Sequence, residues 1–143
     1  MSKGNQFETD FLGLIFNGVA IANIADNAAS GALTNLQVAL HTSDPGEAGD
    51  QTSGEVNYTG YARTAVARTT GGWVVTNNSV SPVAAIAFPS ATSTSTMSAT
   101  YASVGTSTSG AGKILYKGAL SPTINISQGV TPRVTTGSSI TED

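Results

Sequence analysis

The side chains best suited to chemistry lie in one stretch, where the only histidine precedes a run of acids. His41 is followed by four of the nine acidic residues, which are Asp44, Glu47, Asp50 and Glu55. Carboxylate oxygens are the ligands that Ca²⁺ prefers, but this spacing does not match an EF-hand loop. A solvated acidic tip is the first interpretation, and a metal site or contact with a basic partner surface are the alternatives.

A catalytic role for His41 lacks the other parts that it would need. A Ser–His–Asp triad would have to use this histidine, because the chain has no other. No G-x-S-x-G signature of a nucleophile surrounds it, and the absence of cysteine removes a thiolate nucleophile and cysteine-ligated metals. We therefore predict a protein that is not an enzyme, with no cofactor and no metal site, in which His41 is a surface or hydrogen-bonded strand residue.

Two strand-like runs are expected to position this stretch. In Leu36–His41, apolar residues alternate with others at the two-residue period of a strand with one buried face. The run Tyr61–Arg68 alternates in a similar way. Between the two runs, Pro45 and Gly46 favour a turn, because proline presets φ and glycine reaches positive φ. The sequence therefore predicts a β-hairpin with an elaborate tip.

One helix is predicted, over residues Asn5–Asn17. It is followed by Gly18, which suits a left-handed C-cap. Its apolar residues recur at the spacing of one helical face, and they are Phe7, Phe11, Leu14 and Ile15. We predict that this face packs on the sheet, with docking on a neighbouring subunit as the alternative.

The remainder of the chain predicts short strands about ten residues apart, separated by turns. One N-terminal helix, with no helices alternating between strands, indicates a mainly β fold: an antiparallel β-sandwich or jelly-roll-like barrel with one N-terminal amphipathic helix. Residues 1–35 are assigned to this helix and a connecting arm, and residues 36–143 to the β-sandwich. At 143 residues these form a single structural domain overall.

Composition narrows the classes of partner. Only 10% of the residues are charged, against about a quarter in typical proteins. Such a surface does little to keep copies apart, so it favours a protein packed against neighbours, including further copies of itself, over a compact monomer. The net charge of −3, with no basic patch, argues against nucleic-acid binding. No long apolar run or secretory signal is present, which argues against a membrane location.

Several short motifs occur in combination along the chain. They are Leu36–Gly46 (LQVALHTSDPG), Gly60–Arg63 (GYAR), Trp73, Ala84–Pro89 (AAIAFP) and Ser103–Gly105 (SVG). Together they resemble a small family of tailed-bacteriophage virion proteins often labelled "tail fibre protein". The resemblance covers nearly all of the chain. It implies a non-enzymatic virion structural protein that is assembled in the host cytoplasm.

The resemblance leaves the place in the virion open. The chain lacks the long repeats and coiled-coil heptads of a fibre shaft. A capsid decoration or cement protein, which stabilises the head by binding between capsomers, is therefore the preferred hypothesis. A tail, collar or fibre-attachment component is the main alternative, and a receptor- or carbohydrate-binding module is the third. The expected partners are the major capsid protein or other virion proteins, together with further copies of the chain.

The candidate interface residues lie on the helix, in the acidic loop, at the base of the hairpin and near the C-terminal end. They are Phe7, Phe11, Leu14, Ile15, Asp44, Glu47, Tyr58, Tyr61 and Arg133. Tyr58 and Tyr61 would form the small carbohydrate-binding face. Arg133 would either reach an acidic neighbour or extend from the sheet into solvent.

Overall fold

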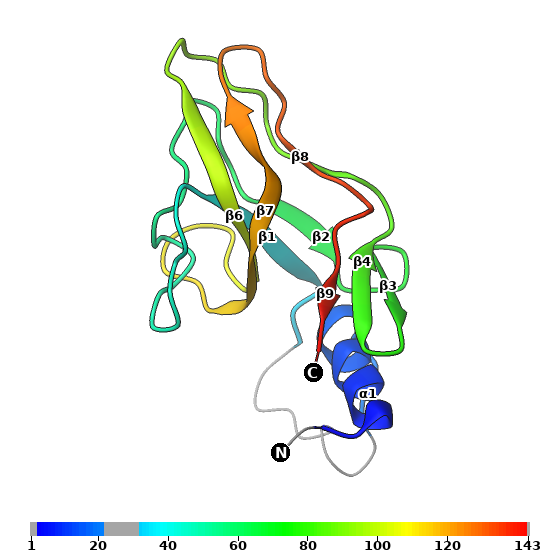
Figure 1. Ribbon diagram of the computed structural model, residues 1–143. Helices are drawn as coiled ribbons and strands as arrows, with labels where there is room; N and C mark the ends of the chain where they lie inside the picture. The colour runs from blue at the N-terminus through cyan, green and yellow to red at the C-terminus, as the bar shows by residue number, and fades with distance from the viewer. Residues whose placement is uncertain (1–2, 22–31, 143) are drawn as a thin grey trace. The chain divides into compact units, whose positions relative to one another are not determined.

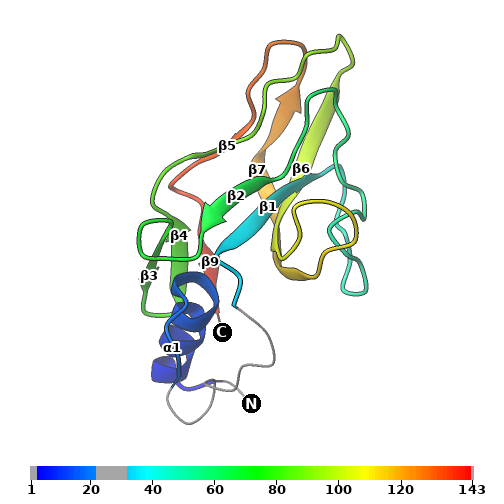
Figure 2. The same ribbon diagram turned by 180° about the vertical axis from the view of Figure 1, so that it is seen from behind.

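The computed structural model describes residues 3–21 and 32–142 (Figure 1; Figure 2 from behind). The described elements are α1 (Asn5–Asn17), β1 (Asn35–His41), β2 (Thr64–Ala67), β3 (Trp73–Thr76), β4 (Ser79–Pro82), β5 (Ile86–Ala87), β6 (Met97–Gly105), β7 (Ile114–Ile126), β8 (Arg133–Val134) and β9 (Ile140–Thr141). The strand pairs with a defined register are antiparallel. The predicted class, mainly β with one N-terminal helix, is therefore confirmed. No helix in the described part is long and apolar enough to cross a membrane.

The chain separates into two compact units. The helix unit comprises the described residues of 1–35, 67–85 and 135–143, and the sheet unit comprises residues 36–66 and 86–134. Strands β3, β4 and β9 therefore belong with α1, whereas the four-stranded sheet belongs almost entirely to the sheet unit.

The sheet unit is built on a sheet with the strand order β2-β1-β6-β7. Strands β1 and β2 are neighbours, as the predicted hairpin requires, although β2 begins only at Thr64. The pairing of β1 with β6 runs from Gln37 opposite Gly105 to His41 opposite Tyr101. On the other side of β6 lies β7, which ends the sheet.

The prediction that β1 has a single buried face is wrong. Every residue from Leu36 to His41 is buried. The reason is that residues 42–63 fold back over the sheet: the side chain of Gln51 lies against Gly105, which is paired with Gln37, and the carbonyl of Ser53 lies 2.9 Å from His41 Nδ1. A central strand covered on both faces loses the alternation of exposure that an isolated hairpin would show.

The helix unit places α1 against the antiparallel strands β3 and β4. The predicted helix bounds are confirmed, and Gly18 adopts the expected left-handed conformation with φ of 66°. Arg68 reaches the C-terminal end of α1, where its guanidinium donates to the carbonyls of Leu14 and Ile15. A cation at this end stabilises carbonyls that the helix itself leaves without partners.

The prediction of which face of α1 packs on the sheet is wrong. The buried face is rotated about the helix axis by about one residue from the predicted face. The buried residues are Glu8, Leu12 and Phe16, whereas Phe7 is 42% exposed. The ring of Phe16 lies edge-on to Trp73, with centroids 4.8 Å apart. The packing of Phe16 on Trp73 fixes the rotation of α1 about its axis, because such aromatic pairs add stability beyond the apolar area that they bury.

Candidate functional site

An ion pair within the loop between β1 and β2 closes part of this loop on itself. Arg63 donates from Nε to Glu55 Oε1 at 2.7 Å and from Nη2 to Glu55 Oε2 at 2.8 Å. The same guanidinium donates to the carbonyls of Ser107 and Gly110, each at 2.8 Å. The hydrogen bond to Glu55 raises the pKa of Arg63 above its usual value. With its side chain 2% exposed, Arg63 joins two loops that lie far apart in the sequence.

A buried glutamine makes the second link between these loops. Gln51 is fully buried, its Oε1 accepts from the amide of Ser107 at 3.0 Å, and its Nε2 donates to the carbonyl of Gln37 at 3.2 Å. A Cβ on Gly105 or Gly112 would lie 2.2 Å from atoms of this side chain. The two glycines therefore make the space that Gln51 fills.

His41 and Ser103 form a pair with the connectivity of a nucleophile and its base. His41 Nδ1 lies 2.9 Å from the carbonyl of Ser53, so Nδ1 carries the proton and Nε2 accepts from Ser103 Oγ at 2.7 Å. Burial lowers the pKa of His41, which favours this neutral form. Both residues are at most 1% exposed. Since no substrate can reach Ser103 Oγ, the pair links the loop to the sheet, and the hydrogen-bonded interpretation of His41 is confirmed.

The four acids of the loop do not converge on one point. Asp44 and Glu47 contact Lys117 Nζ at 2.8 and 3.1 Å, whereas Glu55 pairs with Arg63. Asp50 instead accepts from the hydroxyl of Thr52 and, at 2.8 Å, from the backbone amide of Thr52, and these two hydrogen bonds hold the pKa of Asp50 below its usual value. Within residues 3–21 and 32–142, no group of three or more His, Cys, Asp or Glu is placed to hold a metal ion.

The tyrosines at the base of the hairpin pack against each other. The rings of Tyr58 and Tyr61 pack edge to face with centroids 5.3 Å apart, and Tyr61 stacks on Phe88. Tyr58 is 3% exposed and donates its hydroxyl to the carbonyl of Pro89 at 2.7 Å. Burial raises the pKa of Tyr58 to about 12. The ring of Tyr58 is therefore not available to a sugar, whereas for the half-buried Tyr61 a role in binding stays a prediction.

The remaining candidate interface residues occupy different places. Phe7 is exposed, with its ring centroid 6.1 Å from that of the half-buried Phe11. Leu14 and Ile15 are also half-buried, and Arg133 is exposed on β8. The outward orientation of Arg133 agrees with the second of its two predicted positions. As interface residues, the exposed and half-buried members of the set stay predictions.

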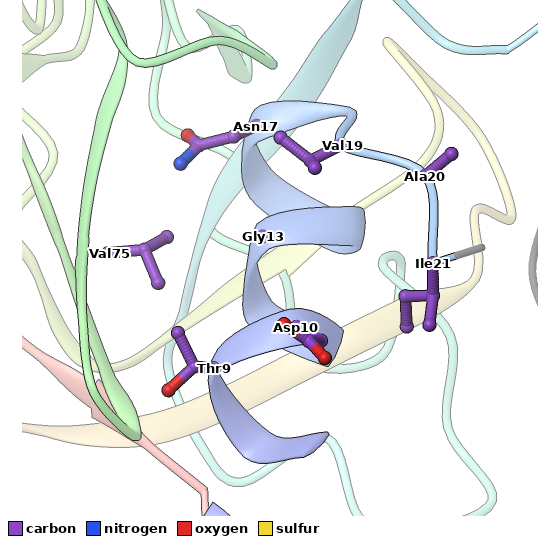
Figure 3. Close-up of a pocket in the computed structure, with 8 residues that line it drawn as sticks. All are labelled: Thr9, Asp10, Gly13, Asn17, Val19, Ala20, Ile21 and Val75. Carbon is purple, nitrogen blue, oxygen red and sulfur yellow. The ribbon is translucent and has the colours of Figure 1, made fainter. Parts of the chain in front are cut away.

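A groove of about 260 Å³ lies beside α1 in the helix unit (Figure 3). It is lined by Thr9, Asp10, Gly13, Asn17, Val19, Ala20, Ile21 and Val75. Val75 comes from β3 and faces the helix across the groove (Figure 3). The lining offers apolar contacts with a few polar groups, but no cation and no pair of nucleophile and base.

The sequence does not indicate which groups hold the acidic loop in place, namely two cationic side chains and one backbone amide. Lys117 lies 73 residues from Asp44, and Ser107 lies 56 residues from Gln51. Contacts of such separation leave no periodicity to detect. Arg63 was present in one of the motifs, and its position eight residues after Glu55, with a turn between them, is the one local signal for their pairing.

A protein-family model described as Podophage GP4 fiber I protein gp80 matches residues 7–141 of the chain. The matched range includes every described strand and most of α1. No curated protein matches the chain. The matched range also contains the loop between β1 and β2 together with the residues that hold it in place.

Proposed function

We propose that this chain, which belongs to the family of Podophage GP4 fiber I protein gp80, is a bacteriophage virion structural protein that forms part of a fibre assembly. The observation that carries this proposal is the match over residues 7–141, which spans parts of both compact units. It favours the fibre-attachment alternative over the capsid decoration that we preferred from the sequence.

The role proposed within the fibre is that of a junction, not a shaft. A shaft needs long repeats or coiled-coil heptads. In the part of the chain that the structure describes, the helix has 13 residues and the strands are arranged in small sheets. These elements suit a compact module that attaches one virion protein to another.

The exposed apolar surface supports the helix unit as a contact surface. The large hydrophobic side chains that are exposed among the described residues all belong to this unit, and they are Phe7, Val19, Leu33, Val74 and Val83. Single exposed apolar residues are common, but all five of these lie in the helix unit, which favours this unit over the sheet unit as the place of contact. We therefore assign binding of other virion proteins to the helix unit.

Capsid decoration is the second candidate, and a different observation favours it. The low charge of the chain, 10% of its residues, suits a protein packed among many neighbours in a shell. A protein in this role would stabilise the head by binding only the assembled shell.

Cross-linking mass spectrometry of purified virions separates the two roles. A fibre component is expected to cross-link to tail or fibre proteins and to occur in a small number of copies set by the symmetry of the tail. Cross-links to the major capsid protein, with copies in fixed ratio to it, would instead identify a decoration protein. If the chain is absent from purified virions, both proposals are wrong.

A further inference from the structure

The groove of the helix unit lies between α1 and β3, and it offers three kinds of contact to one ligand. Val75 of β3 faces the helix across it (Figure 3). Strand β3 is the end strand of the order β3-β4-β9, and in the described part of the chain its outer edge has no strand beside it. We propose that the groove binds an extended segment of another virion protein, with an apolar side chain in the groove and a lysine or arginine two residues before it. This inference rests on the assignment of virion-protein binding to the helix unit.

The backbone of Val75 is open to such a segment. Strands β3 and β4 pair in a continuous register, and next to them the amide of Val83 donates to the carbonyl of Gly72 at 3.0 Å. Because hydrogen-bonded and non-hydrogen-bonded pairs alternate along antiparallel strands, the backbone groups of Trp73 and Val75 point away from β4. Within residues 3–21 and 32–142, no group outside this strand pair binds the amide or the carbonyl of Val75.

The neighbouring groups on the same edge already have partners. The amide of Trp73 donates to a carbonyl of the preceding turn at 3.0 Å. In the amide orientation that satisfies both of its polar atoms, Asn17 donates to the carbonyl of Trp73 at 3.2 Å. At the other end, Thr9 Oγ1 donates to the carbonyl of Asn77 at 2.8 Å. One residue of an incoming antiparallel segment can therefore exchange both of its backbone hydrogen bonds with Val75, between these two closed positions.

The side chain of that incoming residue is expected to be apolar. Residues opposite each other in a strand pair place their side chains on the same face, so this side chain would enter the groove beside Val75. Gly13 leaves the opposite wall of the groove without a side chain, and Val19, which is 57% exposed, adds an apolar wall. An apolar side chain in this space would cover surface of Val19 and Val75 that is otherwise exposed to water.

The charge of the groove selects a basic segment. Asp10 is the charged residue among those that line it. Its Oδ1 accepts from Gln6 Nε2 at 2.9 Å, and none of the ion pairs between described residues involves it. The contact of the adjacent Thr9 with Asn77 places Asp10 toward the C-terminal end of β3. In an antiparallel segment, the residue two positions before the apolar one lies on the same face toward this end, where a lysine or arginine would meet Asp10.

A titration of the full chain followed by nuclear magnetic resonance tests the proposal. The probe is the acetylated and amidated peptide Thr-Thr-Lys-Thr-Leu-Thr-Thr, in which lysine and leucine have the required spacing. Saturable shifts are expected at Gly13, Ala20 and Val75, with the amide of Val75 moving downfield as it gains a hydrogen bond. Replacing the lysine of the peptide by glutamate should weaken binding about threefold or more, and replacing the leucine by alanine about tenfold or more. No saturable shift at millimolar peptide, or equal binding of the lysine and glutamate peptides, would overturn the proposal.

Gly13→Leu closes the groove in a chain that should still fold. A Cβ at Gly13 would have only Val19 Cβ within 4 Å, at the ordinary contact distance of 3.9 Å, and leucine favours a helix more than glycine does. The variant should be at least as stable as the wild type and should bind the peptide about tenfold more weakly or worse. Gly13→Ala, which adds a much smaller side chain, should keep most of the affinity. If Gly13→Leu binds the peptide like the wild type, the groove is not the binding site.

Gly137→Leu is the matched control for this substitution. Gly137 is exposed in the helix unit, and the nearest atom to an added Cβ is 3.7 Å away. Measured per purified particle, Gly13→Leu should be depleted from virions and Gly137→Leu should not. Full incorporation of Gly13→Leu would overturn this inference but not the proposed function, which fails if the chain is absent from virions.

Discussion

Arg63 and Glu55 meet through two parallel hydrogen bonds, from Nε to Oε1 at 2.7 Å and from Nη2 to Oε2 at 2.8 Å. The planar guanidinium and carboxylate match in this arrangement, which restrains both side chains more than a single contact would. Because Arg63 also binds the carbonyls of Ser107 and Gly110, one residue determines where two loops lie on the sheet.

Replacing Arg63 by alanine should destabilise the protein by about 3–5 kcal/mol, because Glu55 and two carbonyls would lose a largely buried partner. Urea unfolding followed by tryptophan fluorescence and circular dichroism measures this loss. Arg133→Ala is the matched control, since Arg133 is exposed on β8, and it should change stability by no more than about 0.5 kcal/mol. Equal effects of the two substitutions would contradict the role given to Arg63.

The stability of the protein should fall as the pH is lowered below the ordinary pKa of histidine, 6.5. Burial lowers the pKa of His41 in the folded state, so between the folded pKa and 6.5 the unfolded chain binds the additional proton. The contribution of neutral His41 to the free energy of unfolding is complete above pH 6.5, and it is lost as the pH falls toward the pKa of His41 in the folded state. Urea unfolding at about pH 7.5 and about pH 5.5 measures the difference.

His41→Gln provides the control for this pH dependence, because His41 is the only histidine of the chain. The variant should be less stable at both pH values but should show little change between them. If the stability of the variant changes with pH as steeply as that of the wild type, the pH dependence comes from other groups. The carboxyl groups of Asp44 and Asp50, whose pKa values are lowered, should lose their contributions only at more acidic pH.

Gly112→Ala should destabilise the fold by about 1–3 kcal/mol, as overpacking of a filled interior does. The new Cβ would lie 2.2 Å from Gln51 Oε1 and 2.6 Å from Ser107 Cβ. Gln51 cannot move away without losing its bonds to the amide of Ser107 and the carbonyl of Gln37. Thermal unfolding compares this variant with Gly118→Ala, whose Cβ meets nothing and should be tolerated. If Gly112→Ala leaves the thermal stability unchanged, Gln51 does not fill this space tightly.

The elements that could be predicted from the sequence are those set by local signals. The helix Asn5–Asn17 was expected at the bounds that it has, and the predicted strand Leu36–His41 is longer by one residue, Asn35. In each case turn residues stand close to the element: Gly18 follows the helix, and Pro45 and Gly46 follow the strand. A turn signal of this kind depends on a few neighbouring residues, so it can be recognised without knowledge of the rest of the chain.

The burial of the elements could not be predicted in the same way. The side of α1 that packs depends on Trp73, which lies 57 residues after Phe16 in the sequence. The second buried face of β1 depends on a polar loop that folds back because Arg63, Gln51 and His41 bind distant groups. Side-chain pairings of this kind are tertiary, and they override the exposure that a polar, glycine-containing loop would ordinarily have.

Phe7→Ser should reduce incorporation of the protein into virions while leaving its fold intact. Phe7 is 42% exposed and lies in the unit that carries the exposed large hydrophobic residues, so its loss removes apolar contact area but no core contact of comparable size. Its effect on the free energy of unfolding should be within about 0.5 kcal/mol. Phe16→Ala, by contrast, removes a fully buried ring that packs on Trp73 and should cost about 3–5 kcal/mol.

Complementation separates loss of binding from loss of folding in these two variants. Phage grown with each variant supplied in place of the wild-type protein are purified, and the amount of the protein per particle is measured by mass spectrometry. Phe7→Ser should remain soluble and folded in the lysate yet be depleted from particles, whereas Phe16→Ala should already be reduced in the lysate. Full incorporation of Phe7→Ser would exclude Phe7 from the contact surface and leave Val19, Leu33, Val74 and Val83 as the next positions to test.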